Sequence, residues 1–365
     1  MKLEIENIGK IEKGVVEIGG LTIVAGENDT GKSTIGKVLY SLINGKDNLL
    51  NTFVLEFKKN LISFGKNKAK IKFDNFEINI LKRLDKYDPI ISGKDDNKYI
   101  RAILIDSIEL ELLKLKKEMT KSTEVHELVD VPVKNRGGVS TFFNRKEPML
   151  AKSTETKTEK IDLNEIISHK IDLLNKVKDG LLKYNKQSDI SKIKNFELIE
   201  EMAEIIGGHW EFNETNNEFY FVKKENSDNY FSSINTASGI KNFLIIDGLI
   251  KGDYLNENTI LIIDEPEAHL HPEWQVKYAE VIVKLLEKNI PIVIITHSGD
   301  FLQGLMNLIT KKQGLINKTS ISYVENMESG TIIKSGGYNI KENEELLSKI
   351  YDNLTAPSWR IINNG

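Results

Sequence analysis

The chain of 365 residues contains no cysteine. This absence excludes disulfide bonds, thiolate zinc sites and a catalytic thiol, and it is typical of proteins in a reducing compartment. No apolar run reaches the length needed to span a bilayer, and the first residues lack the apolar segment of a secretory signal. We therefore expect a cytoplasmic protein that makes no membrane contact.

The chain also lacks a strong charge of either sign. Lys and Arg number 50 against 54 Asp and Glu, which gives a formal net charge of −4. Any contact with nucleic acid would therefore depend on a local basic surface rather than on the charge of the whole chain. The length and the 40% hydrophobic content suffice for a large core, in two domains or in one domain with an insertion.

A phosphate-binding motif follows a short apolar strand expected at residues 21–25. Residues 26–33 read Gly-Glu-Asn-Asp-Thr-Gly-Lys-Ser and fit the P-loop pattern G-x-x-x-x-G-K-[ST], and an amphipathic helical pattern follows. Backbone N–H groups of such a loop surround phosphates, Lys32 would reach the β- and γ-phosphates, and Ser33 would take one Mg²⁺ position. The predicted nucleotide-binding residues are Gly26, Asn28, Thr30, Gly31, Lys32, Ser33 and Thr34.

A second motif begins with four consecutive apolar residues, 260–263, of the kind found in a strand buried on both faces. Asp264 and Glu265 follow directly. Burying two adjacent carboxylates is costly, so the pair requires a cation or a reacting group nearby. The alternative is a strand that ends in an ordinary solvated turn.

Three weaker features accompany these motifs. Ser238-Gly239 precedes a helical pattern and could bind an anion or simply cap the helix. His297 follows an apolar strand expected at residues 290–295 and could be structural or chemical. A metal cluster is a further alternative, formed by His269 and His271 with Glu265 and Glu267.

Basic residues gather between positions 51 and 100. Residues 70–73 and 76–80 alternate apolar and polar side chains around Asp74-Asn75, which predicts a hairpin. The basic side chains would form either a patch for the DNA backbone or a solvated face, and the sequence leaves both open. They are Lys58, Lys59, Lys66, Lys68, Lys70, Lys72, Lys82 and Arg83.

The motifs fall in two separated parts of the chain. We expect residues 1–100 to form an N-terminal lobe with the P-loop, and residues 206–365 a C-terminal lobe. Residues 101–205 would form a helical insertion, with a mobile loop over 120–160 where periodicity fades. Helices are expected at 110–119, 161–185, 193–206, 240–250 and 342–351, and strands at 3–8, 15–18, 99–105, 210–212, 219–222, 321–324 and 331–334.

The order of these motifs resembles that of the ATP-binding cassette (ABC) ATPases in the branch of structural maintenance of chromosomes (SMC) and recombination repair. More closely, it is similar to the OLD-like group, whose E-P-E-x-H-L-H-P matches residues 265–272. The group's T-H-S-P-x-F-L is matched at residues 296–302, with Gly299 in place of proline. The resemblance covers residues 1–50 and 206–303.

The resemblance implies an α/β fold, with an ABC-type core and a mostly helical insertion, and hydrolysis of ATP with Mg²⁺. It implies that Ser33 and Asp264 position Mg²⁺, that Glu265 orients the attacking water, and that His297 contacts the γ-phosphate, beside the phosphate contact of Lys32. Ser238 and Gly239 would reach the ATP of a second copy, which implies a head-to-head homodimer or a higher oligomer.

Two departures from the ABC pattern limit the resemblance. The family has a glutamine soon after the P-loop helix, whereas the first glutamine here is Gln187, so that role stays unassigned. Residues 237–240 are shorter than the transporter signature L-S-G-G-Q, which argues against a transporter subunit. Nucleases of the OLD family also carry a metal-binding Toprim domain, but the only aspartate after residue 303 is Asp352. We expect no nuclease activity from this chain.

Three functions remain open. The favoured one is an ATP-driven sensor or clamp in a bacterial anti-phage defence system of the Gabija, Septu or PARIS kind, acting with a separately encoded effector, most naturally a nuclease. The second is an ATPase of DNA repair or chromosome maintenance that binds DNA. The third is a scaffold that binds ATP with little turnover, against which Glu265 argues.

Overall fold

The computed structural model describes residues 1–45, 49–57, 61–83, 86–93, 98–106, 168–187, 194–224, 230–233, 238–312, 314–327 and 330–354. The helix expected over 110–119 and the mobile loop expected over 120–160 lie outside these residues. So does the start of the helix expected over 161–185.

Five neighbouring strands of an eleven-stranded sheet are parallel, and the P-loop, Asp264 and His297 lie at the ends of three of them. Their order is β13-β3-β12-β11-β7, and each neighbouring pair is parallel. β3, β7, β11 and β12 are almost continuously apolar and buried, as a sheet covered on both faces requires, and β13 is buried over its first six residues. Their bounds are β3 Leu21–Gly26, β7 Arg101–Ile105, β11 Thr259–Asp264, β12 Ile292–Thr296 and β13 Thr319–Met327.

The other half of the sheet forms a mainly antiparallel lobe in the order β6-β5-β4-β1-β2-β14. The hairpin predicted around Asp74-Asn75 is confirmed as β4–β5. β6 was not expected, because Pro89 and the flanking charges hide the strand pattern, and an edge strand tolerates both. The bounds are β1 Lys2–Ile8, β2 Ile11–Glu17, β4 Lys68–Phe73, β5 Phe76–Arg83, β6 Lys86–Ser92 and β14 Gly330–Gly337.

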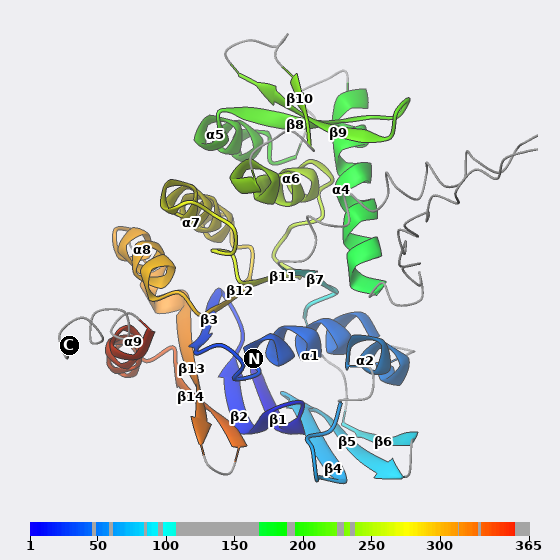
Figure 1. Ribbon diagram of the computed structural model, residues 1–365, viewed down its shortest axis with the longest axis vertical. Helices are drawn as coiled ribbons and strands as arrows, with labels where there is room; N and C mark the ends of the chain where they lie inside the picture. Colours follow the sequence, from blue (N-terminus) through cyan, green and yellow to red (C-terminus); the bar gives the residue numbers. More distant parts are fainter. Residues whose placement is uncertain are drawn as a thin grey trace, which may run out of the picture.

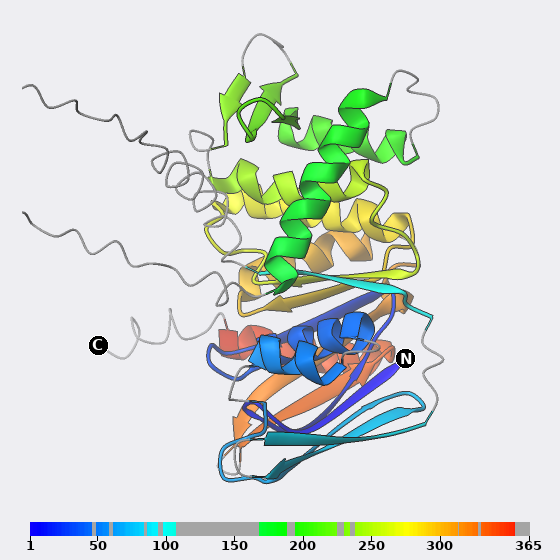
Figure 2. The ribbon, with the colours of Figure 1, turned by 90° about the vertical axis from the view of Figure 1, so that its right-hand side faces the viewer.

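Helices cover the sheet in two groups. α1 (Lys32–Gly45) and α2 (Leu49–Phe57) lie between the parallel strands and the antiparallel lobe, where they share one hydrophobic core with both (Figures 1 and 2). The other face packs against α7 (Pro272–Glu287), α8 (Gly299–Thr310) and α9 (Ile340–Leu354), and the short η5 (Ile316–Lys318) precedes β13. No helix among the described residues is long and apolar enough to cross a membrane.

A helical layer above β7 contains α4 (Ser168–Lys186), α5 (Phe196–Ile206) and α6 (Ser238–Lys251), with a small sheet of β8 (Gly208–Asn213), β9 (Glu218–Lys223) and β10 (Tyr230–Ser232) (Figure 1). α4 and α6 approach so closely that a Cβ added to Gly180 would lie 1.9 Å from the carbonyl oxygen of Gly248. The layer shares the hydrophobic core of the main sheet, so it is packed on that sheet rather than extended from it.

The predicted α/β fold with a parallel sheet, flanking helices and an antiparallel lobe is confirmed. One boundary needs a correction. The sequence places residues 101–105 in the insertion, yet β7 pairs with β11 along its whole length and forms one edge of the main sheet, opposite β6. Pairing between strands far apart in the chain is a tertiary property, which local periodicity does not contain.

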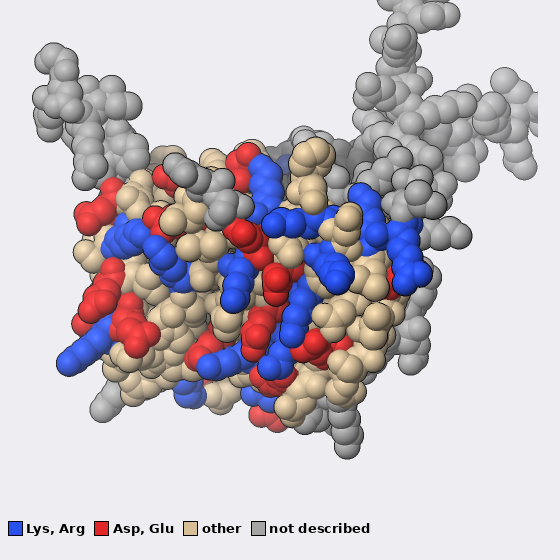
Figure 3. Space-filling view, turned by 90° about the horizontal axis from the view of Figure 1, so that it is seen from below, with Lys and Arg blue, Asp and Glu red and all other residues tan. Residues whose placement is uncertain are grey.

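The antiparallel lobe carries mixed charge on its solvent side. Lys70 lies 2.8 Å from Glu77, Lys72 lies 3.5 Å from Glu4, and Arg83 lies 3.3 Å from Asp88. Figure 3, which views the molecule from below, shows acidic and basic side chains interleaved over this face. Of the two alternatives left open for the basic segment, these described contacts favour a solvated face.

Candidate functional site

The loop between β3 and α1 has the backbone geometry expected of a P-loop. Gly31 has φ +84° and Asp29 has φ +65°, so the chain turns in the left-handed region, which glycine adopts without strain. The Thr30 hydroxyl donates to the Glu27 carbonyl at 2.9 Å, and the Thr34 N–H donates to the Gly31 carbonyl at 3.0 Å. The first turn of α1 therefore follows directly, and its N-terminus faces the loop as an anion site.

Lys32 is held inside this loop. It is 5% exposed, and its ammonium donates to the Glu27 carbonyl oxygen. Burial lowers the pKa of Lys32, while the carboxylates of Glu265 and Asp264 act in the opposite direction. The ammonium is thus placed between the loop and the end of β11, where a phosphate would replace the carbonyl as its partner.

Asp264 ends β11 beside the P-loop. A hydrogen bond from Ser33 reaches its carboxylate, but burial outweighs that bond and raises the pKa of Asp264 to about 6. Its Oδ1 is buried and has no hydrogen-bond partner. An orphaned carboxylate oxygen next to a serine hydroxyl fits a divalent cation, whose remaining ligands would be phosphate oxygens and water. Ser33 and Asp264 would hold this Mg²⁺.

The raised pKa of Asp264 predicts a pH-dependent effect of Asp264→Asn on the metal-free protein. The folded pKa of about 6 lies above the ordinary 3.8, so wild type loses stability as the pH rises through that window. Asn has no charge to bury. We expect the gain in free energy of unfolding from Asp264→Asn, relative to wild type, to increase by up to about 3 kcal/mol between pH 4 and pH 7. Urea unfolding in EDTA at both pH values measures this, and an equal effect at both would contradict it.

The third part of the site joins the ends of β11 and β12. His297 Nδ1 lies 3.4 Å from Glu265 Oε1 and 3.3 Å from Glu267 Oε1. Glu265 has φ +55°, a conformation that non-glycine residues rarely adopt, and its N–H donates to the Ile295 carbonyl at 2.8 Å. Local strain of this kind is common at functional sites. The structure thus brings the predicted Glu265 and His297 together.

Glu267 organises this corner, a role that the sequence did not indicate. Its Oε1 accepts hydrogen bonds from the Thr296 hydroxyl at 2.7 Å, the His297 N–H at 3.1 Å and the Ser298 N–H at 3.2 Å. Its side chain is 5% exposed. In the sequence Glu267 was one member of a possible metal cluster with His269 and His271. No three such side chains converge as a metal site in the described part of the chain.

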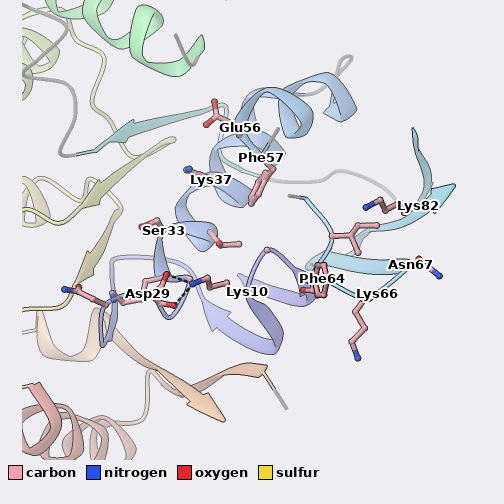
Figure 4. Close-up of a pocket in the computed structure, with 18 of the residues that line it drawn as sticks. Lys10, Asp29, Ser33, Lys37, Glu56, Phe57, Phe64, Lys66, Asn67 and Lys82 are labelled. Carbon is pink, nitrogen blue, oxygen red and sulfur yellow. Dashed lines mark hydrogen bonds and ion pairs between the residues drawn. The ribbon is translucent and has the colours of Figure 1, made fainter. Parts of the chain in front are cut away.

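A cavity of about 970 Å³ opens between the P-loop and the antiparallel lobe. Figure 4 shows Ser33 and the hydrogen-bonded pair Lys10–Asp29 on the P-loop side, and Lys66 and Lys82 on the lobe side. The Lys10 ammonium also lies 3.3 Å from the Asp29 carbonyl oxygen, so it braces the left-handed turn. The volume is in the range of small-molecule sites, and phosphates at the P-loop would leave room for a base and ribose.

Ser238 and Gly239 begin α6, as expected of a helix start. α6 lies on the opposite side of β7 from α1 and the P-loop (Figure 1). The side chains at the first positions of α6 fall outside what the structure describes. Their role toward a second copy stays a prediction.

The comparisons with known proteins agree with this fold. Residues 133–302 match a family model described as an AAA ATPase domain, which is a little under half of the chain. The crystal structure of an SMC head bound to the C-winged helix domain of ScpA matches with a TM-score of 0.52 at 12% identity, and it covers 94% of this chain and 98% of that one. No curated protein sequence matches.

Two further SMC heads match with lower scores. The head domain from Thermotoga maritima has a TM-score of 0.45 at 10% identity, covering 91% of this chain and 97% of that one. The head with an extended coiled coil, bound to the C-terminal domain of ScpA from Pyrococcus furiosus, has a TM-score of 0.49 at 15% identity, covering 96% and 98%. The first of these structures shows that the chain has the fold of an SMC head, and residues 133–302 are similar to an AAA ATPase domain.

Proposed function

We propose that the chain hydrolyses ATP with Mg²⁺ between two copies arranged head-to-head, and acts as a sensor or clamp in a bacterial anti-phage defence system. A separately encoded effector, a nuclease in the simplest case, would carry out the response. The observation that carries the catalytic part is the meeting of Lys32, the Ser33–Asp264 pair and the Glu265–His297 pair at the carboxyl ends of β3, β11 and β12.

Each residue has a distinct task in this reaction. Lys32 and the N–H groups of residues 26–31 bind the β- and γ-phosphates. Glu265 orients and polarises the attacking water, and His297 contacts the γ-phosphate from the end of β12. Bound Mg²⁺ would supply charge that stabilises the transferring phosphoryl group. The side chains of Glu265 and His297 are both 35% exposed. Bulk water must therefore be excluded from the site by a group that this copy of the chain does not supply.

A second copy would provide that cover. Ser238 and Gly239 at the start of α6 would present a hydroxyl and backbone N–H groups to the γ-phosphate bound by the partner. Because a twofold interface is the same surface on both subunits, each copy would then complete the other's site. ATP would hold the two copies together, and its hydrolysis would release them.

A complementation experiment tests the composite site. Lys32→Ala removes the phosphate contact, and Ser238→Arg blocks the contact to the partner. Each variant alone should be inactive. In an equal mixture, half of the dimers contain one of each, and each of these has one intact site, so turnover should return to about one quarter of wild type. Inactivity of the mixture, together with no ATP-dependent dimer in wild type by light scattering, would overturn the proposal.

The defence role is tested in cells. A bacterial host that carries the gene with its genomic neighbours should resist phage, and Lys32→Ala should remove the protection. The resemblance of residues 265–272 to the OLD-like group supports this role. Sensitivity to DNA damage without any effect on phage would instead indicate the DNA-repair function.

Glu267→Ala is expected to slow turnover by about 100-fold, because a displacement of roughly 1 Å at the reacting groups has an effect of that size. The substitution removes the acceptor that holds the backbone of His297 and Ser298. ATP binding at the P-loop should change little. Single-turnover hydrolysis and nucleotide titration measure the two effects separately. Glu267→Gln, which keeps an acceptor oxygen, serves as the matched control and should retain more of the rate.

A further inference from the structure

An aromatic side chain that is fully exposed to solvent lines the cavity beside the P-loop. Phe64 is 104% exposed, and Figure 4 shows it on the side of the antiparallel lobe, across the cavity from Ser33. Single apolar residues are common on protein surfaces, so exposure alone indicates nothing about function. The backbone that carries Phe64 and the other residues of the cavity give this exposure a meaning.

Backbone hydrogen bonds fix the segment on both sides of Phe64. Residues 61–63 make two such bonds with residues 7–9 at the end of β1, each of 3.0 Å. Beyond Phe64, the Asn67 carbonyl accepts from the N–H of Lys82 on β5 at 2.9 Å. The segment is therefore attached to two strands of the lobe, and the position of the aromatic ring is limited mainly by its own side-chain rotation.

Phe64 is the second residue of a tight turn between these attachments. The Lys66 N–H donates to the Ser63 carbonyl at 3.0 Å, and Gly65, the third residue of the turn, has φ +75°. Most residue types are compatible with the second position of such a turn, and a polar one would expose no apolar surface there. Since the ring of Phe64 is fully exposed, its packing contributes nothing to the fold.

The cavity is polar at the P-loop and has apolar side chains elsewhere on its wall. Besides Phe64, it is lined by Phe57 and Ile62, which are buried. Phe57 packs against Phe53 with their ring centroids 6.1 Å apart, so its ring is held from behind. A nucleotide has the same division, because its phosphates are charged and its base is a flat aromatic ring. Phosphates bound by Lys32 would leave the base among these apolar groups.

We propose that Phe64 stacks on the base of the bound nucleotide and favours purine over pyrimidine bases, because the larger purine ring stacks over more area. Stacking on an aromatic side chain uses the flat face of the base, which every base has, and contributes substantially to binding. A turn that is already fixed loses little backbone freedom when the base binds. The inference rests on the proposed function, since phosphates at the P-loop determine where the base lies.

Isothermal titration calorimetry with Mg²⁺ and three ligands tests this: ADP, CDP and pyrophosphate, none of which the proposed ATPase reaction consumes. Phe64→Ala should weaken ADP binding about tenfold to a hundredfold, the range measured for the loss of one base–aromatic stack. It should weaken CDP binding less. Pyrophosphate has no base, so its affinity should not change. Phe64→Trp keeps an aromatic ring and should bind ADP as wild type does.

The matched control is Tyr230→Ala, which removes a 65% exposed aromatic ring on β10, outside the cavity, and should change none of the three affinities. If Phe64→Ala weakens pyrophosphate binding as much as ADP binding, the P-loop has been disturbed and the stacking inference is overturned. An ADP affinity equal to that of wild type overturns it as well. An unchanged ratio of ADP to CDP affinity in Phe64→Ala rejects the preference for purines.

Two results separate this inference from the proposed function. If wild type binds ADP and pyrophosphate but Phe64→Ala loses no ADP affinity, only the role of Phe64 fails. If wild type binds neither ligand, the proposed function fails and the inference fails with it.

Discussion

Glu265→Gln is expected to slow ATP hydrolysis by roughly a thousandfold, in the range of effects of general-base groups. The amide keeps the size of the side chain but neither polarises water nor accepts its proton. Phosphate contacts at Lys32 and Ser33 remain, so ATP should still bind. The variant should therefore accumulate as an ATP-bound dimer that wild type forms only transiently. Phosphate release and multi-angle light scattering on the same sample measure both effects.

The matched control is Glu273→Gln on α7, which makes the same change on an exposed side chain (70%). It should hydrolyse and dimerise as wild type does. Glu265→Gln with unchanged turnover would remove Glu265 from the reaction. If Glu265→Gln loses turnover as expected but forms no dimer, the catalytic role of Glu265 stands. The proposal that bound ATP holds two copies together would then be rejected.

Asp247→Ala is expected to lower the free energy of unfolding by about 3–5 kcal/mol, because it leaves a buried ammonium unpaired. The side chains of Lys251 and Asp247 are 0% and 3% exposed, with Nζ and Oδ2 2.8 Å apart. The pair also joins α6 to β8: Asp247 accepts from the Trp210 N–H at 3.0 Å, and Lys251 donates to the Trp210 carbonyl at 2.9 Å. Removing the carboxylate therefore breaks two links at once. Urea unfolding followed by circular dichroism measures the loss.

A pair with the same spacing provides the control. Glu273 and Lys277 on α7 also stand four residues apart, at 3.4 Å, but their side chains are 70% and 30% exposed. Glu273→Ala should cost about 0.5 kcal/mol or less. Replacing both buried partners, in Asp247→Leu with Lys251→Met, should cost less than Asp247→Ala alone. A loss from Asp247→Ala that equals the surface control would show that the buried pair contributes little.

The motifs could be located from the sequence because their chemistry depends on short stretches. The P-loop needs glycine, Lys32 and Ser33 at fixed spacing between a strand and a helix, and β3 and α1 supply that context. The apolar run before Asp264 favours a strand buried on both faces, because it is short, rich in isoleucine and has no polar side. The hairpin of β4 and β5 follows from an equally local pattern.

Other features depend on contacts between distant segments. β6 becomes recognisable as a strand only through its pairing with β5. The place of β7 in the main sheet likewise follows from its pairing with β11. Glu267 and Lys170 look like ordinary charged residues in the sequence, and their importance comes from burial against Thr296 and Asp106.

The sequence by itself determined the P-loop, the acidic end of β11 and the α/β class, because backbone conformation and strand burial follow from neighbouring residues. Only the tertiary structure decided which side chains surround these groups. The cost of burying Glu267 and Lys170 is offset by partners that lie 29 or more residues away in the chain. At Asp264 the hydrogen bond from Ser33 offsets only part of that cost. Those partners are set by the packing of β7, β11, β12 and α4, which no local pattern specifies.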